Sequence, residues 1–222
     1  PKIVPRTHNS LINGIEYCSK SWEQSIEDVN LLAGPIGHDL TFSKGFMGTL
    51  TTLGKVVFLD SVDNKDICET IEREKVTSII WVPTLAQRLL QYEDLHKYDL
   101  SSLKKMHSAG GASHPDLVKE VTERLKMKFF NGYGGTEGMT TITRARDPLE
   151  VICTTVGRPT SPFDTYKVID AKGKISSKRW TYDRIGSHGN SRAVIRFLAP
   201  AEVKGVALLI VNHPDKASDQ WM

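Results

Sequence analysis

The stretch with the clearest chemical potential is NGYGGTEG, residues 131–138, in which four glycines surround one hydroxyl and one carboxylate. Glycine amides can approach phosphate oxygens closely and donate hydrogen bonds to them. The Thr136 hydroxyl can donate another hydrogen bond, whereas the Glu137 carboxylate would repel a phosphate unless a cation such as Mg²⁺ lies between them. The segment therefore indicates a phosphate and magnesium site. A tight strand-to-helix turn with a capping Thr and a solvated Glu is the alternative interpretation.

Other glycine motifs do not account for this segment. The dinucleotide fingerprint GxGxxG fits Gly132 and Gly134 but requires its third glycine at the position of Glu137. The sequence contains no GxxxxGK[ST], GxSxG or HExxH motif. These absences exclude an ATPase-type phosphate loop, a nucleophile elbow and a zincin helix from the interpretation.

Composition narrows the class of protein. The 222 residues are 39% hydrophobic and 25% charged, and the net charge of +3 comes from Lys and Arg scattered among acids. No apolar run reaches the roughly 20 residues of a membrane span. The three cysteines have no CxxC spacing, so we interpret them as reduced thiols. We expect a cytoplasmic protein with neither a nucleic acid nor a membrane as its partner.

The elements that position the glycine segment alternate between strands and helices. Short apolar runs predict strands at 55–60, 76–82, 103–109 and 126–130. Helical patterns lie between them at 64–75, with Asn64 as a plausible N-cap, and at 84–93. A third helix begins at Ser113, with Asp116 three residues on in a capping-box arrangement. This alternation predicts an α/β fold, a largely parallel sheet flanked by helices.

The two glycine segments follow consecutive strands of this sheet. AGGAS (109–113) and NGYGGTEG both come at carboxyl ends, the edge where open α/β sheets bind ligands. Before them, residues 33–50 predict a glycine-rich turn that runs into a small-residue helix. Strand-like runs after about residue 174 predict an irregular, β-rich tail.

Jointly these motifs resemble those of the adenylate-forming enzymes, which include acyl- and aryl-CoA synthetases, luciferases and peptide-synthetase adenylation domains. GYGGTEG resembles their YGxTE motif, SAGGAS their GGA adenine loop, and VGRP (156–159) their VG[KR]P segment. The segments PRTHN, IGH, IEREKVT and TTVGRPTSPFD are most similar to aryl-acid-AMP ligases that activate 2,3-dihydroxybenzoate or salicylate, as in siderophore biosynthesis. The resemblance implies that 1–174 is an internal part of the large N-terminal domain and that 175–222 is a divergent tail.

The resemblance implies a two-step reaction. A carboxylate attacks the α-phosphate of ATP, which gives an acyl-adenylate and pyrophosphate, with Mg²⁺ as the metal. A thiol of CoA or of carrier-protein phosphopantetheine then displaces AMP. The acid would be an ortho-hydroxy or ortho-amino benzoate. Alternatives are a fragment of an aliphatic or fatty acyl-CoA ligase and a non-catalytic nucleotide-binding module.

The resemblance also implies site residues. Nucleotide contacts are expected at Gly110, Gly111, Ala112, Asn131, Gly132, Tyr133, Gly134 and Thr136. Contacts with the acid are expected at His38, Asp39, Gly110, Gly135 and Val156. Catalytic roles fall to His38, Thr136 and Glu137, with Glu137 holding Mg²⁺ and Tyr133 stacking on adenine. His107 and His114 match no motif, so we interpret them as structural.

Asp39 bears on which acid is bound. Dihydroxybenzoate ligases usually have Asn after the histidine, and amino-acid-activating domains have Asp there. A carboxylate accepts hydrogen bonds and favours a donor, so Asp39 adds weight to an ortho-amino group. Lys44 would cancel that inference if it paired with Asp39.

Three parts of the family pattern are missing from the sequence. These are the glycine-rich body of the phosphate loop, the TGD aspartate that holds the ribose, and the lid-domain lysine. We therefore expect the isolated chain to bind nucleotide weakly and to show essentially no turnover.

Overall fold

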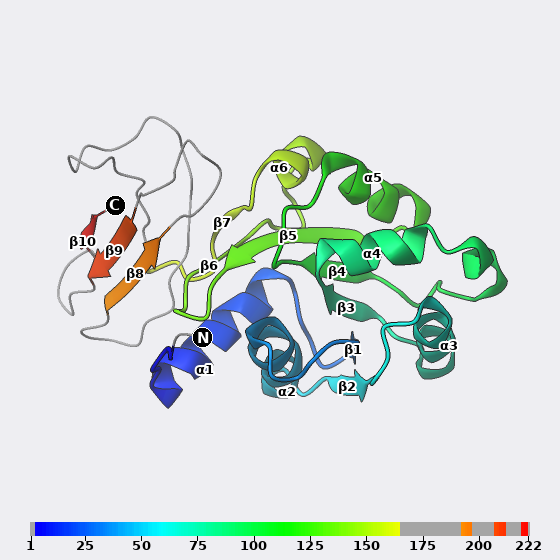
Figure 1. Ribbon diagram of the computed structural model, residues 1–222, viewed down its shortest axis with the longest axis horizontal. Coiled ribbons are helices and arrows are strands. Elements are labelled where there is room, and N and C mark those ends of the chain that lie inside the picture. Colours follow the sequence, from blue (N-terminus) through cyan, green and yellow to red (C-terminus); the bar gives the residue numbers. More distant parts are fainter. Residues whose placement is uncertain (1–2, 165–191, 197–206, 212–218, 222) are drawn as a thin grey trace.

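A computed structural model describes residues 3–164 and three short strands beyond them at 192–196, 207–211 and 219–221 (Figure 1). The main sheet has the strand order β2-β1-β3-β4-β5-β6-β7. Its strands are β1 (Val29–Leu32), β2 (Lys55–Phe58), β3 (Ser78–Trp81), β4 (Lys105–Ser108), β5 (Lys128–Gly134), β6 (Thr140–Ile142) and β7 (Arg158–Pro159). The pairs from β2 to β5 are parallel, and β6 and β7 add in antiparallel pairing. The predicted α/β class is confirmed.

Helices cover both faces of this sheet, as Figure 1 shows, with α4, α5 and α6 on one side and α1 and α2 on the other. The α-helices are α1 (His8–Ser21), α2 (Gly48–Thr51), α3 (Asn64–Glu74), α4 (Pro83–Leu90), α5 (Pro115–Arg124) and α6 (Leu149–Thr154). A π-helix, η1 (Leu40–Met47), runs directly into α2, and a 3₁₀ helix, η2 (Glu93–Lys97), follows α4. The predicted turn and small-residue helix at 33–50 are confirmed by η1 and α2.

The alternation of side chains along β3 explains why its sequence is continuously apolar. Ile79 and Trp81 belong to the larger core, which also holds residues of α3, α4 and α5. Ile80 points to the other face and packs in a smaller cluster with Trp22, which follows α1, and Phe130 of β5. Because both faces of the strand are buried, apolar and polar residues do not alternate along it.

The predicted helices are present, and two predicted caps are wrong by one residue. The cap of α3 is Asp63 rather than Asn64, because the Asp63 carboxylate accepts from the Lys65 amide at 2.8 Å. The cap of α5 is His114 rather than Ser113, since its side chain accepts from the Asp116 amide. His114 is thus structural, as predicted.

The strand-to-helix alternative for NGYGGTEG is wrong. β5 continues through Gly134, and the chain then reverses into antiparallel β6. The turn is closed by two hydrogen bonds, from the Gly135 amide to the Met139 carbonyl at 3.1 Å and from the Gly138 amide to the Gly135 carbonyl at 3.0 Å. The motif is therefore a β-hairpin with Thr136 and Glu137 at its tip.

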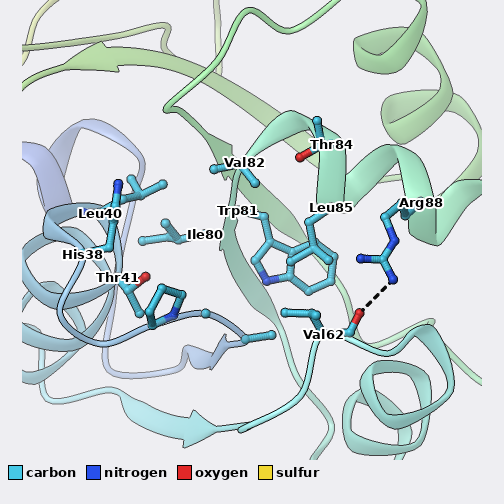
Figure 2. A pocket seen from close by; sticks show the side chains of 13 residues that line it. His38, Leu40, Thr41, Val62, Ile80, Trp81, Val82, Thr84, Leu85 and Arg88 are labelled. Carbon is cyan, nitrogen blue, oxygen red and sulfur yellow. Dashed lines mark hydrogen bonds between the residues drawn. The ribbon is translucent and has the colours of Figure 1, made fainter.

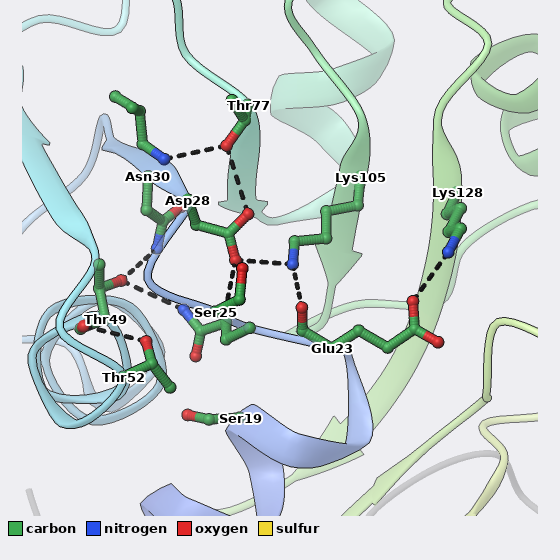
Figure 3. Close-up of polar contacts among 12 residues, drawn as sticks. Ser19, Glu23, Ser25, Asp28, Asn30, Thr49, Thr52, Thr77, Lys105 and Lys128 are labelled. Atoms are coloured by element: carbon green, nitrogen blue, oxygen red, sulfur yellow. Dashed lines mark hydrogen bonds and ion pairs between the residues drawn. The ribbon is translucent and has the colours of Figure 1, made fainter.

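The amino-terminal edge of the sheet is held by a buried polar cluster (Figure 3). Lys105, at the start of β4, lies 2.7 Å from the Asp28 carboxylate and also donates to the Glu23 carbonyl. Asp28 accepts two further hydrogen bonds, from the Ser25 amide at 2.8 Å and from the Thr77 hydroxyl at 3.3 Å. The cluster joins the loop before β1 to the middle of the sheet.

Beyond residue 164, β8 (Arg192–Arg196), β9 (Ala207–Val211) and β10 (Asp219–Trp221) form a separate antiparallel sheet. The strand-like runs predicted in the tail are therefore confirmed. The predicted boundary at residue 174 lies outside the described residues. In the described part of the chain all three cysteines are free, and no helix has the length and apolarity needed to cross a bilayer.

Candidate functional site

The carboxyl ends of β4 and β5 lie side by side, because Ser108 pairs with Asn131 in parallel register. The loop after β4 and the hairpin at the end of β5 consequently border one cavity of about 190 Å³. Its wall consists of His38, Asp39, Leu40, Lys44, His107, Ala109, Gly110, Tyr133, Gly134, Gly135, Thr136 and Thr140. We call this cavity the strand-tip pocket. The meeting of the two glycine segments predicted from the sequence is confirmed.

A second, larger cavity of about 540 Å³ lies on the other side of the glycine loop. Its lining is Ala112, Ser113, Asn131, Val151, Cys153, Thr154, Thr155, Val156, Gly157 and Arg158. We call it the α6 pocket. The loop serves both cavities, since Ala109 and Gly110 line the first whereas Ala112 and Ser113 line the second. Most of the expected site residues are thus divided between two neighbouring pockets.

Two residues shape the α6 pocket through the backbone. The Asn131 amide group donates to the carbonyls of Ile152 at 3.3 Å and Thr155 at 2.9 Å, which ties the end of α6 to β5. Gly157 of the VGRP segment has φ of +79°, and a Cβ there would lie 2.0 Å from the carbonyl carbon of Ile142. Only glycine fits that position.

The hairpin tip presents Thr136 and Glu137 to solvent at the rim of the strand-tip pocket. Within the described residues, no hydrogen bond engages the amide of either residue. Burial raises the pKa of Tyr133, and the nearby charge of Glu137 raises it further. The tip therefore offers two free amides, a hydroxyl and a carboxylate next to a half-buried aromatic ring.

Three expected residues line neither pocket: Gly111, Gly132 and Glu137. Gly132 makes room for a neighbour instead, because a Cβ there would lie 2.5 Å from His107 Nε2. A Cβ on Gly111 would touch the Pro83 ring at 3.4 Å. Close packing thus requires glycine at position 132 but not at position 111, and the nucleotide contacts expected of both stay predictions.

His38 and Asp39 enter the strand-tip pocket from the turn before η1. The Nδ1 of His38 accepts from the Leu40 amide at 3.2 Å, and Asp39 Oδ1 accepts from the Ser43 hydroxyl at 2.6 Å. Among the described residues Lys44 forms no ion pair with Asp39. The pairing that would have cancelled the inference from Asp39 is therefore absent from this part of the structure.

His38 and Leu40 also line a third cavity, of about 310 Å³, shown in Figure 2. The remaining wall is largely apolar and comes from the turn at 33–35 and from the β3–α4 connection, with Trp81, Val82 and Leu85 in view. Arg88 closes one side by donating to the Val62 carbonyl at 3.3 Å. We call it the His38 side pocket.

His107, which we interpreted as structural from the sequence, also lines the strand-tip pocket. Its ring is 1% exposed and lies 5.6 Å from the Trp22 ring, between centroids. Burial lowers the pKa of His107 to about 3, and the charge of Lys44 lowers it further. No motif marks this histidine, but its place in a strand two residues before AGGAS was a usable signal. In a parallel sheet that position lies next to the ligand-binding edge.

The hairpin residues can bind Mg²⁺ only if substrate phosphates supply further ligands to the metal. In the described part of the chain, no cluster of three His, Cys, Asp or Glu side chains can hold a metal ion. Mg²⁺ is commonly bound through one or two carboxylates together with substrate phosphates and water. Glu137, alone and exposed, fits that second mode.

A parallel sheet with a pocket at the carboxyl ends of its strands places the chain among the open α/β proteins that bind ligands at that edge. More specifically, the chain belongs to the AMP-binding enzyme family, whose model matches residues 1–180.

Relatives and solved structures agree with this assignment. The chain is 34% identical over 176 residues to the 2-hydroxy-7-methoxy-5-methyl-1-naphthoate–CoA ligase of Streptomyces carzinostaticus. The aligned region covers 78% of this chain and 32% of that protein. It is 32% identical over 170 residues to the 2,3-dihydroxybenzoate-AMP ligase of Bacillus subtilis, and this aligned region covers 76% of the chain and 32% of that protein. The apo structure of MbtA from Mycobacterium smegmatis shares the fold, with a TM-score of 0.71 at 22% identity, over 100% of this chain and 36% of that one. The chain thus spans about a third of the length of the curated relatives it matches.

Proposed function

We propose that the protein containing this chain activates an aryl carboxylic acid with ATP and passes the acyl group to a thiol. The observation that carries this proposal is the strand-tip pocket, which brings Asp39, Gly110 and Thr136 to one cavity. The two curated relatives, whose names give them as ligases of aromatic acids, support it.

The first step joins two anions, so it requires charge neutralisation more than it requires an acid or a base. The free amides at the hairpin tip and the Thr136 hydroxyl would donate hydrogen bonds to phosphate oxygens. The Glu137 carboxylate would hold Mg²⁺, which supplies the positive charge that the reacting carboxylate and α-phosphate need. Adenine would then lie between Tyr133 and the glycine loop that separates the two pockets.

The size of the strand-tip pocket favours a compact acid. Its volume of about 190 Å³ is below the roughly 300 Å³ at which pockets for drug-sized ligands begin. A single-ring acid suits such a cavity better than the long chain of the fatty-acid alternative. Asp39 at its wall favours an ortho hydroxyl or amino substituent that can donate to a carboxylate.

The thiol would reach the acid through the His38 side pocket. This largely apolar cavity and the strand-tip pocket have His38 and Leu40 in common in their walls, and Figure 2 shows both residues beside the side pocket. A phosphopantetheine arm, of CoA or of a carrier protein, has a narrow shape that suits such a cavity. His38, exposed at the junction, is then the residue that both substrates pass.

Nucleotide binding tests the metal role of Glu137. Titration calorimetry of the 222-residue chain with ATP, with and without Mg²⁺, should show tighter binding with the metal. Glu137→Gln should retain the metal-free affinity and lose most of the gain. Glu150→Gln, which alters an exposed carboxylate on α6, is the matched control and should behave as the unaltered chain does.

Pyrophosphate exchange by the full-length protein tests the substrate class. Salicylate, anthranilate and 2,3-dihydroxybenzoate should differ as substrates, and at least one should support exchange. Equal indifference to all three would end the aryl-acid proposal. An unchanged magnesium gain in Glu137→Gln would end the metal role alone.

A further inference from the structure

The segment that carries Lys44 along the strand-tip pocket is a π-helix rather than an α-helix. In η1 the Gly48 amide donates to the Ser43 carbonyl, five residues back, as well as to the Gly45 carbonyl. π-Helical turns are rare, and they occur mostly as short insertions in α-helices, frequently at functional sites. The winding of η1 therefore requires a stabilising feature close to it.

The π-helical winding brings Asp39 and Lys44 to the same side of the helix. Both side chains line the strand-tip pocket although they are five residues apart. In an α-helix, which has 3.6 residues per turn, residues five apart lie roughly 140° from each other around the axis. A turn closed by an i→i+5 hydrogen bond contains more residues, so the fifth residue returns nearer to the starting face. An α-helical η1 would present only one of these two side chains to the pocket.

A buried group of hydrogen bonds holds the end of this helix. The Thr49 hydroxyl, in α2, donates to the Gly45 carbonyl of η1 at 2.7 Å. The same oxygen accepts from the side-chain amide of Gln24 at 3.1 Å and from that of Asn30 at 2.9 Å, and Figure 3 shows the bond from Asn30. All three side chains are buried. We call Thr49, Gln24 and Asn30 the Thr49 hub.

The Thr49 hub favours the π-helical winding over the α-helical one. Converting a π turn to an α turn takes one residue out of the turn, so one end of the helix must rotate by roughly 100° and shift by roughly 1.5 Å. At Thr49 such a movement would leave two buried amide groups without their acceptor, and each loss costs about 1–3 kcal/mol. The other end of η1 follows a turn in which the His38 amide donates to the Pro35 carbonyl at 3.0 Å. Because both ends are held, the extra residue stays within η1.

We propose that Thr49 is a positioning residue, which acts on the reaction through η1. With Gln24 and Asn30 it holds the π-helical winding, and this winding presents Asp39 and Lys44 to the strand-tip pocket together. Thr49 itself is not part of the pocket wall. The effect on activity rests on the proposed function, whereas the effect on the winding does not.

A purely structural role for the Thr49 hub would leave a different signature. A loss of packing alone would lower the amount of active protein and reduce kcat without distinguishing between the substrates. A loss of positioning would raise the KM for the acid and leave the KM for ATP unchanged. The reason is that Thr136 and Glu137, which are proposed to meet the phosphates and Mg²⁺, lie on the hairpin between β5 and β6 and not on η1.

Nuclear magnetic resonance of the 222-residue chain tests the winding directly. Scalar couplings across hydrogen bonds identify the carbonyl that accepts from the Gly48 amide. In the unaltered chain we expect a coupling to the Ser43 carbonyl. In Thr49→Val this coupling should be lost and replaced by one to the Lys44 carbonyl, four residues back, as in an α-helix. Thr49→Ser keeps the hydroxyl and should retain the coupling to Ser43.

Thr51→Val is the matched control, because it removes another threonine hydroxyl that bonds to the same backbone. The Thr51 hydroxyl donates to the Gly48 carbonyl at 2.9 Å, but Thr51 is exposed. This variant should therefore keep the coupling between Gly48 and Ser43. Near-ultraviolet circular dichroism checks that each variant keeps its tertiary packing.

Pyrophosphate exchange by the full-length protein tests the consequence for activity, with the acid that supports the fastest exchange. Thr49→Val should raise the KM for this acid about tenfold or more, since a hydrogen bond or contact with a charged side chain has that worth. The KM for ATP should stay within about twofold. Thr49→Ser and Thr51→Val should leave both constants within the same limit.

Three results would overturn the proposal. Persistence of the Gly48–Ser43 coupling in Thr49→Val would show that the Thr49 hub does not hold the winding. A changed coupling without a rise in the KM for the acid, or with an equal rise in the KM for ATP, would show that the winding does not position the pocket side chains. Absence of exchange by the unaltered protein with every acid would remove the proposed function and the positioning role together, and the couplings would still decide what holds the winding.

Discussion

His107 is an imidazole placed in an environment where protonation is strongly unfavourable. Its ring is buried against Trp22, and the ammonium of Lys44 lies close enough to disfavour a second positive charge. The pKa of His107 is accordingly lowered to about 3, so the ring is neutral at physiological pH. A neutral imidazole can offer one hydrogen-bond donor and one acceptor to a neighbouring group.

The buried histidine also makes folding sensitive to acid. Its folded pKa of about 3 lies below the ordinary value of 6.5, so the unfolded chain binds the proton first as the pH falls. Stability from this residue is complete above pH 6.5 and is lost as the pH falls toward 3. Between pH 7 and pH 5 the expected loss is roughly 2 kcal/mol. Urea unfolding at the two pH values, followed by tryptophan fluorescence, measures it.

The comparison that isolates this effect uses His107→Leu, in which the pH-dependent loss should shrink by about 2 kcal/mol. The exposed His96 provides the control, and His96→Gln should keep the full dependence. An identical dependence in His107→Leu and the unaltered chain would contradict the burial argument, because the carboxylates are common to both proteins.

At the same scale, the sequence predicted some site residues and missed others for a physical reason. Thr136 and Glu137 stand in a glycine-rich segment, where a hydroxyl and a carboxylate beside bare backbone give a local signal. His107 stands in an ordinary strand and Lys44 in the π-helix η1, and no sequence motif marks either of them. They become site residues only because β4 and η1 meet at the strand-tip pocket, and that meeting is a tertiary fact.

Among the elements, the strands and helices from 55 to 134 were predicted because each has a strong local signal. β3 is a continuous apolar run, and α3 has Ile67 and Ile71 one turn apart on its buried side. α1 and β1 were not predicted. α1 buries small residues such as Gly14 and Ser19 along with Ile15 and Cys18. Its buried face therefore has no regular row of large apolar residues that would predict a helix. β1 is only four residues long, and its buried Asn30 interrupts the pattern.

We expect the buried ion pair of Lys105 and Asp28, which joins the loop before β1 to β4, to contribute strongly to the free energy of unfolding. Lys105→Met would leave the Asp28 carboxylate buried without its counter-charge, and breaking a buried pair in this way costs roughly 3–5 kcal/mol. Denaturant unfolding of the variant measures the loss. The double variant Asp28→Asn with Lys105→Met should recover part of it, because no charge is then left unpaired.

Lys128 is a matched control from the neighbouring strand. It lies 2.8 Å from the Glu23 carboxylate, but both side chains are about half exposed (Figure 3). Lys128→Met should therefore change the free energy of unfolding by about 1 kcal/mol or less. Because both lysines begin their strands, far from the carboxyl edge, the affinity of the folded fraction for ATP with Mg²⁺ should be unchanged. Equal losses from the two lysine variants would show that burial does not govern these pairs.

On the scale of the whole molecule, the sheet has two unlike edges. β7 is two residues long and contains a proline and an arginine, which are features that discourage pairing with another chain. β2 is the edge at the opposite end of the described sheet, and its outer side has no neighbouring strand there. Around it Leu53 is 76% exposed, Phe58 57% and Val62 48%. One end of the sheet is thus protected and the other is apolar and open.

We expect this open edge to drive self-association of the 222-residue chain. An exposed strand edge with apolar side chains pairs readily with a second copy. Sedimentation velocity over a wide concentration range should show the mean mass rising with concentration. Phe58→Lys, which puts a charge on the edge strand, should move the rise to higher concentration. Leu149→Ser removes an exposed apolar residue from α6, away from this edge, and should have no effect. A concentration-independent monomer, or an equal effect of the two substitutions, would show that β2 is not the site of association.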